Sequence, residues 1–148
     1  MIEYSARLVA ATVAGGAIGL NRDLHGKPTG VRTLGLVGLG SALIVVAALL
    51  VGGNGDATRG VQGIVTGIGF LGAGVIVKAA SDDRIHGLTT AASIWLTSAL
   101  GITIGLGHWL LTLVATTLTL VVLIVGGPLE KAIRHRWPHK PDAAEPPP

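Results

Sequence analysis

The chain has 148 residues, of which 49% are hydrophobic, 3% aromatic and 13% charged. Its mean hydropathy of +0.65 and its low charge exclude the soluble globular class. It has no cysteine, which excludes disulfides, thiolate nucleophiles and cysteine-ligated zinc. The net charge of +3 is small and no basic stripe is interleaved with aromatic residues, so nucleic-acid binding is not expected. These features predict an all-α protein whose helices contact the lipid bilayer.

Five apolar segments are long enough, or nearly so, to cross a bilayer, which takes about 20 residues per helix. They cover residues 5–20, 33–51, 61–77, 88–106 and 109–126. The last two segments abut, so a tight turn is expected at Gly105-Leu106-Gly107-His108, with one very long helix as the alternative. The expected fold is therefore a bundle of five transmembrane helices.

Basic residues set the expected orientation, because short cytoplasmic loops accumulate Lys and Arg. Of the 11 Lys and Arg residues, all but Arg7 and Arg59 fall in the first loop, the third loop or the C-terminal segment. Five spans put these three regions on one side, with the N-terminus outside and the C-terminus in the cytoplasm. Four spans would put the basic C-terminal segment on the wrong side.

The expected domains are a transmembrane domain (1–127), a cytoplasmic basic segment (128–137) and a disordered Pro-rich tail (138–148). The basic segment is expected either to form a short amphipathic helix on the inner leaflet, where anionic lipid attracts Lys and Arg, or to be a frayed stop signal.

An internal repeat of a helical hairpin is suggested by two pairs of segments that align at one constant offset. Residues 29–33 align with 86–90, and residues 39–43 align with 96–100. Chance similarity between apolar helices is the alternative. Each copy places a threonine, Thr33 or Thr90, at the start of a helix, where its hydroxyl could cap free backbone N–H groups.

Glycines line one face of the third segment and recur in the first. In a membrane, small residues let helix backbones approach closely. We expect the first and third segments to pack together, with the third segment of a second subunit as the alternative partner, in a homodimer. The residues expected at this contact are Gly15, Gly19, Gly63, Gly67, Gly72 and Gly74.

Four motifs in a fixed order carry a family resemblance: residues 15–23, 26–33, 67–74 and 87–93. From about residue 15 to 109, the chain resembles the MgtC/SapB family of bacterial inner-membrane proteins. The resemblance implies a polytopic protein tied to growth in low magnesium and, in some pathogens, to survival inside host cells. It further implies action on other inner-membrane proteins, the proton-translocating ATP synthase included, rather than transport of magnesium itself.

Two features depart from the family pattern. Asn21 stands where the family usually has Glu, which puts in doubt any role that rests on that carboxylate. Many members carry a soluble C-terminal domain, whereas a short tail follows the last predicted span here. We therefore expect this chain to represent the membrane domain alone.

Polar residues at the loop ends of the predicted helices are the candidate functional cluster. One interpretation is a cluster that docks a partner protein or an anionic lipid headgroup, with Asp23 and Arg32 as an ion pair. The alternative is a set of topology-determining charges that snorkel to the interface. The cluster comprises Asn21, Arg22, Asp23, Arg32, Thr33, Thr89 and Thr90.

Metal binding and catalysis have little support in the sequence. Asp82 and Asp83 are adjacent carboxylates of the kind that hold magnesium together with water, although a solvated loop is the alternative. No residue pair suggests a nucleophile with its base, so neither an enzyme nor a cofactor is expected. The leading interpretation is an interaction protein that modulates other membrane proteins during magnesium limitation. The alternative is a cation transporter or channel, although such proteins usually carry ionisable residues deep in their spans.

Overall fold

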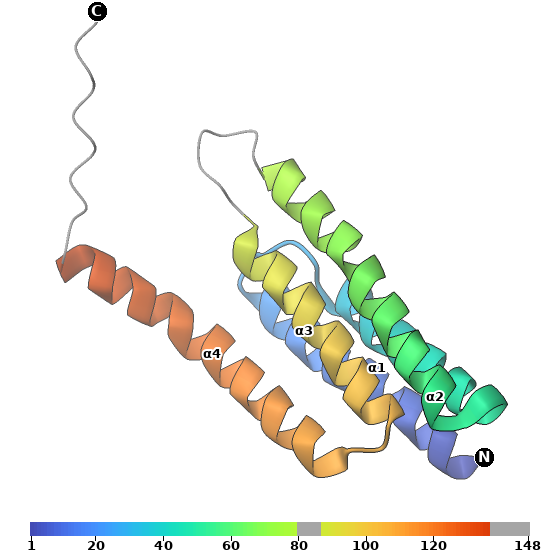
Figure 1. Ribbon diagram of the computed structural model, residues 1–148. Coiled ribbons are helices and arrows are strands. Elements are labelled where there is room, and N and C mark those ends of the chain that lie inside the picture. Colours follow the sequence, from blue (N-terminus) through green and yellow to red (C-terminus); the bar gives the residue numbers. More distant parts are fainter. Residues whose placement is uncertain (80–86, 137–148) are drawn as a thin grey trace, which may run out of the picture.

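The computed structural model describes residues 1–79 and 87–136, and all regular elements within them are α-helices. The helices are α1 (Ile2–Leu24), α2 (Val31–Ala79), α3 (Leu88–Gly105) and α4 (Trp109–Arg136). In Figure 1, α1, α3 and the two halves of α2 lie together, whereas α4 diverges along one flank. The all-α prediction is confirmed.

Helix α2 reverses its direction at Gly53. The backbone there has φ 69° and ψ −150°, a conformation that is essentially confined to glycine. The two halves lie against each other beyond this bend, because a β-carbon on Gly60 would lie 3.4 Å from Ile44 Cγ2 and 3.6 Å from Ala48 Cβ. We call residues 31–52 the first arm of α2 and residues 54–79 its second arm (Figure 1). The connection expected between the segments that end at residue 51 and begin at residue 61 lies in that interval, but it is much shorter than expected, because the residues on both sides of Gly53 are helical.

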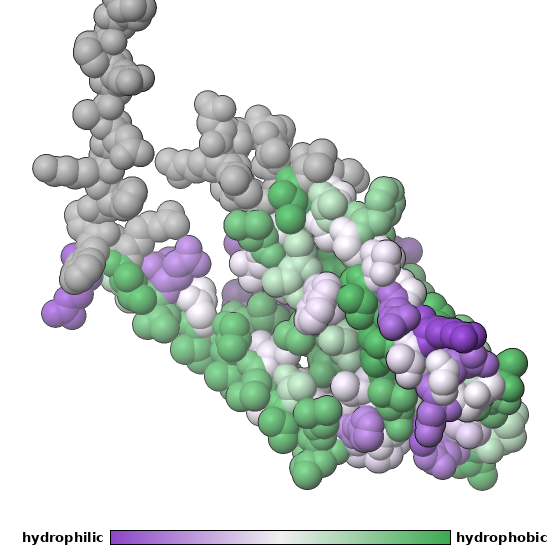
Figure 2. All heavy atoms as spheres, viewed as in Figure 1, coloured by the Kyte–Doolittle hydropathy of each residue, from purple (hydrophilic) through white to green (hydrophobic). Residues whose placement is uncertain are grey.

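Three of the described helical segments are long and apolar enough to cross a membrane, by length and composition: Val31–Ile76, Leu88–Gly105 and Trp109–Ile133. Helix α1 is not among them, because charges near both of its ends lower its mean hydropathy. Figure 2 shows apolar side chains along the visible length of the molecule, with hydrophilic groups gathered near the bend of α2 and at the C-terminal end of α4. This distribution suits a protein whose middle is surrounded by lipid.

Buried aliphatic side chains from α1, α2 and α3 form the core. The largest cluster joins Ile18 of α1, Leu34 and Ile68 from the two arms of α2, and Ile94 and Leu100 of α3. A neighbouring cluster joins Val45 and Ile64 of α2 with Ile102 of α3. Both arms of α2 are therefore held against α3 as well as against each other.

Backbones come into direct contact where α1 and α3 meet the first arm of α2. A β-carbon on Gly15 would overlap the carbonyl oxygen of Leu34, and one on Gly38 would lie 2.5 Å from the carbonyl oxygen of Ala11. Helix α3 approaches the same residue of this arm, since a β-carbon on Gly101 would lie 2.5 Å from the carbonyl oxygen of Gly38. Only glycine permits these approaches.

Two boundaries predicted from the sequence concern α4: the turn before it and the end of the transmembrane domain. The tight turn expected at residues 105–108 is confirmed, with Gly107 at φ 83° between α3 and α4. Helix α4 then continues through Pro128 to Arg136, so no break in the helix marks the predicted boundary between residues 127 and 128. Residues 137–148, which include the predicted tail, lie outside the described residues.

Candidate functional site

The predicted functional residues gather at one end of the bundle. The C-terminal turn of α1 and the first turns of α2 and α3 meet there (Figure 1). We call this group the loop-end cluster; it comprises Asn21, Arg22, Asp23, Arg32, Thr33, Thr89 and Thr90. The sequence pattern correctly placed these residues at helix ends, and the structure brings them to the same end.

Arg22 is the buried centre of the loop-end cluster. Arg22 follows the apolar stretch of α1. The residue is 5% exposed, and its guanidinium donates a hydrogen bond to the Thr90 hydroxyl of α3. The Nε atom of Arg22 has no partner among the described residues. Burial lowers the pKa of Arg22, yet arginine keeps its charge at neutral pH. A buried charge with so few partners is costly, so the Arg22–Thr90 bond strongly constrains how α1 meets α3.

Asp23 fixes the start of α2. Its Oδ2 accepts a hydrogen bond of 2.9 Å from the backbone N–H of Val31, which satisfies one of the free donors at the helix N-terminus. The predicted Asp23–Arg32 ion pair is wrong, because the carboxylate reaches the backbone instead. The expected capping by threonine is also wrong for Thr90, which accepts from Arg22, while the N-cap of α3 is Gly87.

The other members of the loop-end cluster face outward. Arg32, Thr33 and Thr89 are exposed, and Asn21 is half-buried. The cluster therefore has two layers. Arg22, Asp23 and Thr90 tie the helix ends together, and the exposed layer around them is available to a partner.

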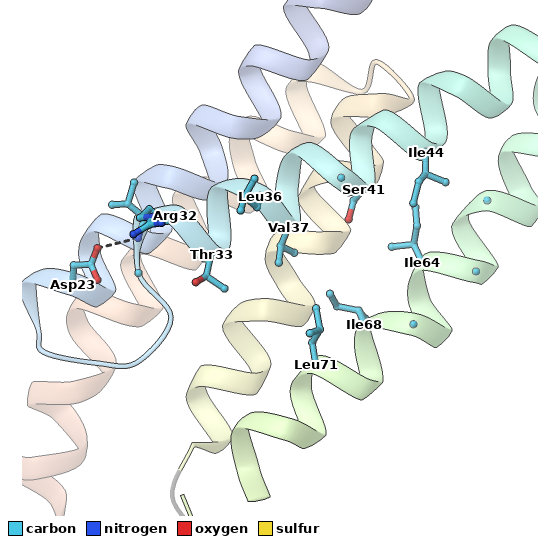
Figure 3. A pocket seen from close by; sticks show the side chains of 16 residues that line it. Asp23, Arg32, Thr33, Leu36, Val37, Ser41, Ile44, Ile64, Ile68 and Leu71 are labelled. Atoms are coloured by element: carbon cyan, nitrogen blue, oxygen red, sulfur yellow. Dashed lines mark hydrogen bonds between the residues drawn. The ribbon is translucent and has the colours of Figure 1, made fainter. Parts of the chain in front are cut away.

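A groove runs from the loop-end cluster between the two arms of α2 (Figure 3). Its volume is about 940 Å³. Asp23, Arg32 and Thr33 lie at its mouth, and its other side chains are mostly aliphatic. The groove was not anticipated, because the sequence pattern does not reveal how far apart the two arms lie.

The predicted glycine contact between the first and third segments is wrong within one chain. Gly15 and Gly19 of α1 do make close contacts, but with the start of the first arm of α2: a β-carbon on Gly19 would lie 2.6 Å from the carbonyl oxygen of Gly30. On the second arm, β-carbons on Gly63, Gly67 and Gly74 would meet no atom within 4 Å, and one on Gly72 would meet Ala91 Cβ at 3.7 Å. Contact between these glycines and a second subunit stays a prediction.

Arg7 holds the opposite end of the bundle and was missed as a site residue. It donates a 2.7 Å hydrogen bond to the carbonyl oxygen of Gly105 at the C-terminus of α3, and it pairs with Glu3 one turn earlier. Helix C-termini present free carbonyls that attract cations. The Glu3–Arg7 spacing and the Gly105–Gly107 turn were the signals available in the sequence.

The metal candidates Asp82 and Asp83 lie outside the described residues. Within residues 1–79 and 87–136, no group of three or more His, Asp or Glu side chains is placed to hold a metal ion.

Long apolar helices, backbone contacts through glycine and polar groups gathered at the ends define an α-helical membrane protein. Residues 8–132 match the MgtC family, and the chain belongs to that family.

The chain is 45% identical to Protein SrpB of Synechococcus elongatus over 82% of this chain and 74% of SrpB. It is 42% identical to "Putative magnesium transporter YhiD" of Escherichia coli K12, over 83% of this chain and 60% of YhiD. Protein MgtC of Brucella abortus is 39% identical over 90% of this chain and 55% of that protein. The chain therefore spans between about half and three quarters of the length of these relatives. No solved structure matches it.

Proposed function

We propose that the chain is a membrane domain that modulates other inner-membrane proteins during adaptation to magnesium limitation. The observation that carries this proposal is the two-layered loop-end cluster. The buried Arg22–Thr90 bond and the Asp23–Val31 bond hold three helix ends in place. The outward layer of Arg32 and its neighbours is thereby presented on a fixed support. A pre-organised polar surface of this kind loses little entropy when a partner binds.

Membership of the MgtC family supports the link to magnesium, and so does the name of its relative YhiD. We propose inner-membrane proteins as the partners, with the proton-translocating ATP synthase as a candidate on the family resemblance, and a homodimer as the assembled form. The chain acts in this proposal without catalysis and without a cofactor.

The proposal includes five membrane crossings, with the N-terminus outside and the C-terminus in the cytoplasm. The reversal of α2 at Gly53 supports it, since the two arms are long enough to act as separate spans. The positive-inside rule then places the loop-end cluster on the cytoplasmic side. A reporter fused after Gly127 should be cytoplasmic and one inserted near Asn54 periplasmic. A periplasmic C-terminus would contradict the five-span topology.

The repeated hairpin also belongs to this proposal. The hydroxyls of Ser41 and Ser98, 57 positions apart, lie 2.9 Å from each other in the interface between the first arm of α2 and α3. The same offset relates the contact of Gly15 with Leu34 to the contact of Gly72 with Ala91. Two like-oriented copies around an axis along the membrane normal account for both coincidences.

The test of function compares Arg32→Ala with Lys131→Ala, since both side chains are exposed and basic. In a strain that depends on this chain for growth in low magnesium, Arg32→Ala should abolish the growth advantage while membrane insertion stays at the parent level. Lys131→Ala should behave as the parent. Full activity of Arg32→Ala would leave Arg32 as a topology determinant only.

Cation transport is the second candidate, favoured by the name of YhiD. Magnesium flux measured with purified protein in liposomes, under an imposed magnesium gradient, decides between modulation and transport. Modulation predicts flux equal to that of protein-free vesicles. Flux well above that level would favour transport.

A further inference from the structure

The groove between the arms of α2 combines an apolar length with one polar end. Its aliphatic walls come from both arms, as Figure 3 shows, and are formed by Leu36, Val37, Ile44, Ile64, Ile68 and Leu71. The hydroxyl of Ser41 lies among them but is already bonded to Ser98 of α3. The length of the groove therefore offers no unsatisfied hydroxyl and suits an apolar occupant.

Glycines keep this groove open. β-Carbons on Gly40, Gly63 and Gly67 would meet no atom within 4 Å, although all three residues line it. Nearer the bend the arms come closer, because a β-carbon on Gly60 would contact Ile44 and Ala48. Ile64 and Ile68 join core clusters with α3 and the first arm, while Gly63 and Gly67, the residues just before them, line the open part of the groove.

The mouth of the groove carries Arg32, a cation that suits an anionic group. Arg32 is exposed there, and the first turn of α2 contains no acidic residue. Asp23 is the acidic group at the mouth, and its carboxylate is engaged with the Val31 N–H. That carboxylate caps the helix end and offsets its positive charge, so Arg32 is the group at the mouth that attracts an anion.

We propose that the groove binds one phospholipid, with an acyl chain between the arms of α2 and its phosphate at Arg32. The length of the groove favours a lipid over a helix as its occupant. From Thr33 to Ile44 the first arm rises roughly 16 Å at 1.5 Å per residue, which matches one leaflet of a hydrocarbon core about 30 Å thick. A helix from a second copy of the chain would extend across both leaflets.

The test uses purified full-length protein in detergent, with phosphatidylglycerol added and binding measured by native mass spectrometry. Gly67→Leu places a side chain in the groove, whereas Gly69→Leu adds the same side chain outside it, and neither β-carbon meets an atom within 4 Å. Gly67→Leu should bind the lipid about tenfold more weakly, equivalent to ~1.4 kcal/mol. Gly69→Leu should bind it as the parent does.

A second pair of variants tests the contact with the lipid headgroup without altering the helix packing. Arg32→Ala should weaken phosphatidylglycerol binding, and Lys131→Ala should leave it unchanged. Equal binding by Gly67→Leu and Gly69→Leu, or by Arg32→Ala and Lys131→Ala, would overturn the proposal. So would loss of a dimer in Gly67→Leu with lipid binding intact, since the groove would then hold a second copy of the chain. The measurement is independent of growth in low magnesium, so lipid binding and the proposed function can fail separately.

Discussion

Two glycine surfaces with the same sequence signature have opposite packing in this protein. Gly15 and Gly19 of α1 lie four positions apart and directly contact backbone atoms at the start of the first arm of α2, in the same chain. Gly63 and Gly67 of α2 have the same spacing, yet their faces are open. Small residues thus permit close approach without requiring it, and the neighbouring elements decide which surface closes.

The way each glycine-bearing helix is connected to its neighbours explains why one glycine surface is closed and the other open. A short loop from His25 to Gly30 joins α1 to the first arm of α2, and the Asp23–Val31 bond pulls their ends together. The second arm is instead anchored through Ile64 and Ile68 to the core it shares with α3. Its glycine side is left to form the groove.

Gly15→Ala should have the largest effect, because the added β-carbon overlaps the Leu34 carbonyl, a backbone atom that cannot rotate away. We expect a loss of about 2–3 kcal/mol of unfolding free energy, as for overpacked cores. Gly16→Ala is the control, since its β-carbon would come no closer than 3.9 Å to Val31 Cγ1. Thermal unfolding in one detergent compares them. Equal melting of the two variants would show that the closed surface is not tight.

Thr90→Val should have the second-largest effect on the unfolding free energy. It keeps the side-chain shape but leaves the buried Arg22 guanidinium without its hydroxyl acceptor. A hydrogen bond to a charged group contributes about 1.5–3 kcal/mol, and we expect a loss in that range. Thr89→Val alters the adjacent, exposed threonine and should be close to neutral. The same unfolding assay applies, and a neutral Thr90→Val would show that the Arg22–Thr90 bond does not hold α1 to α3.

Ser41→Ala should have the smallest effect, since hydrogen bonds between helices in membranes average about 0.6 kcal/mol. Ser41 and Ser98 share one bond, so the double variant should lose less stability than the two single variants added together. Strict additivity of the three unfolding free energies would mean that the serines do not interact. It would also remove one support for the repeated hairpin.

Much of the fold could be predicted because hydropathy and turn chemistry act locally. The helical class and the Gly105–His108 turn follow from such patterns, and so does the placement of Arg22 and Thr90 at helix ends. The sharp bend at Gly53 was less visible, because one residue in a glycine-only conformation reverses the chain within a run of helical residues. Sequence spacing marks small-residue faces but does not name their partners, so the groove and the Arg22–Thr90 bond required the three-dimensional arrangement.

The openness of the second glycine surface can be measured most directly with a single label. The parent contains no cysteine, so Gly67→Cys introduces a unique site for an environment-sensitive fluorophore, and Gly69→Cys gives a matched site outside the groove. In bilayers that contain brominated phospholipid, the open surface predicts strong quenching at both positions. Quenching at residue 69 with protection at residue 67 would mean that protein closes this surface, and would contradict the account.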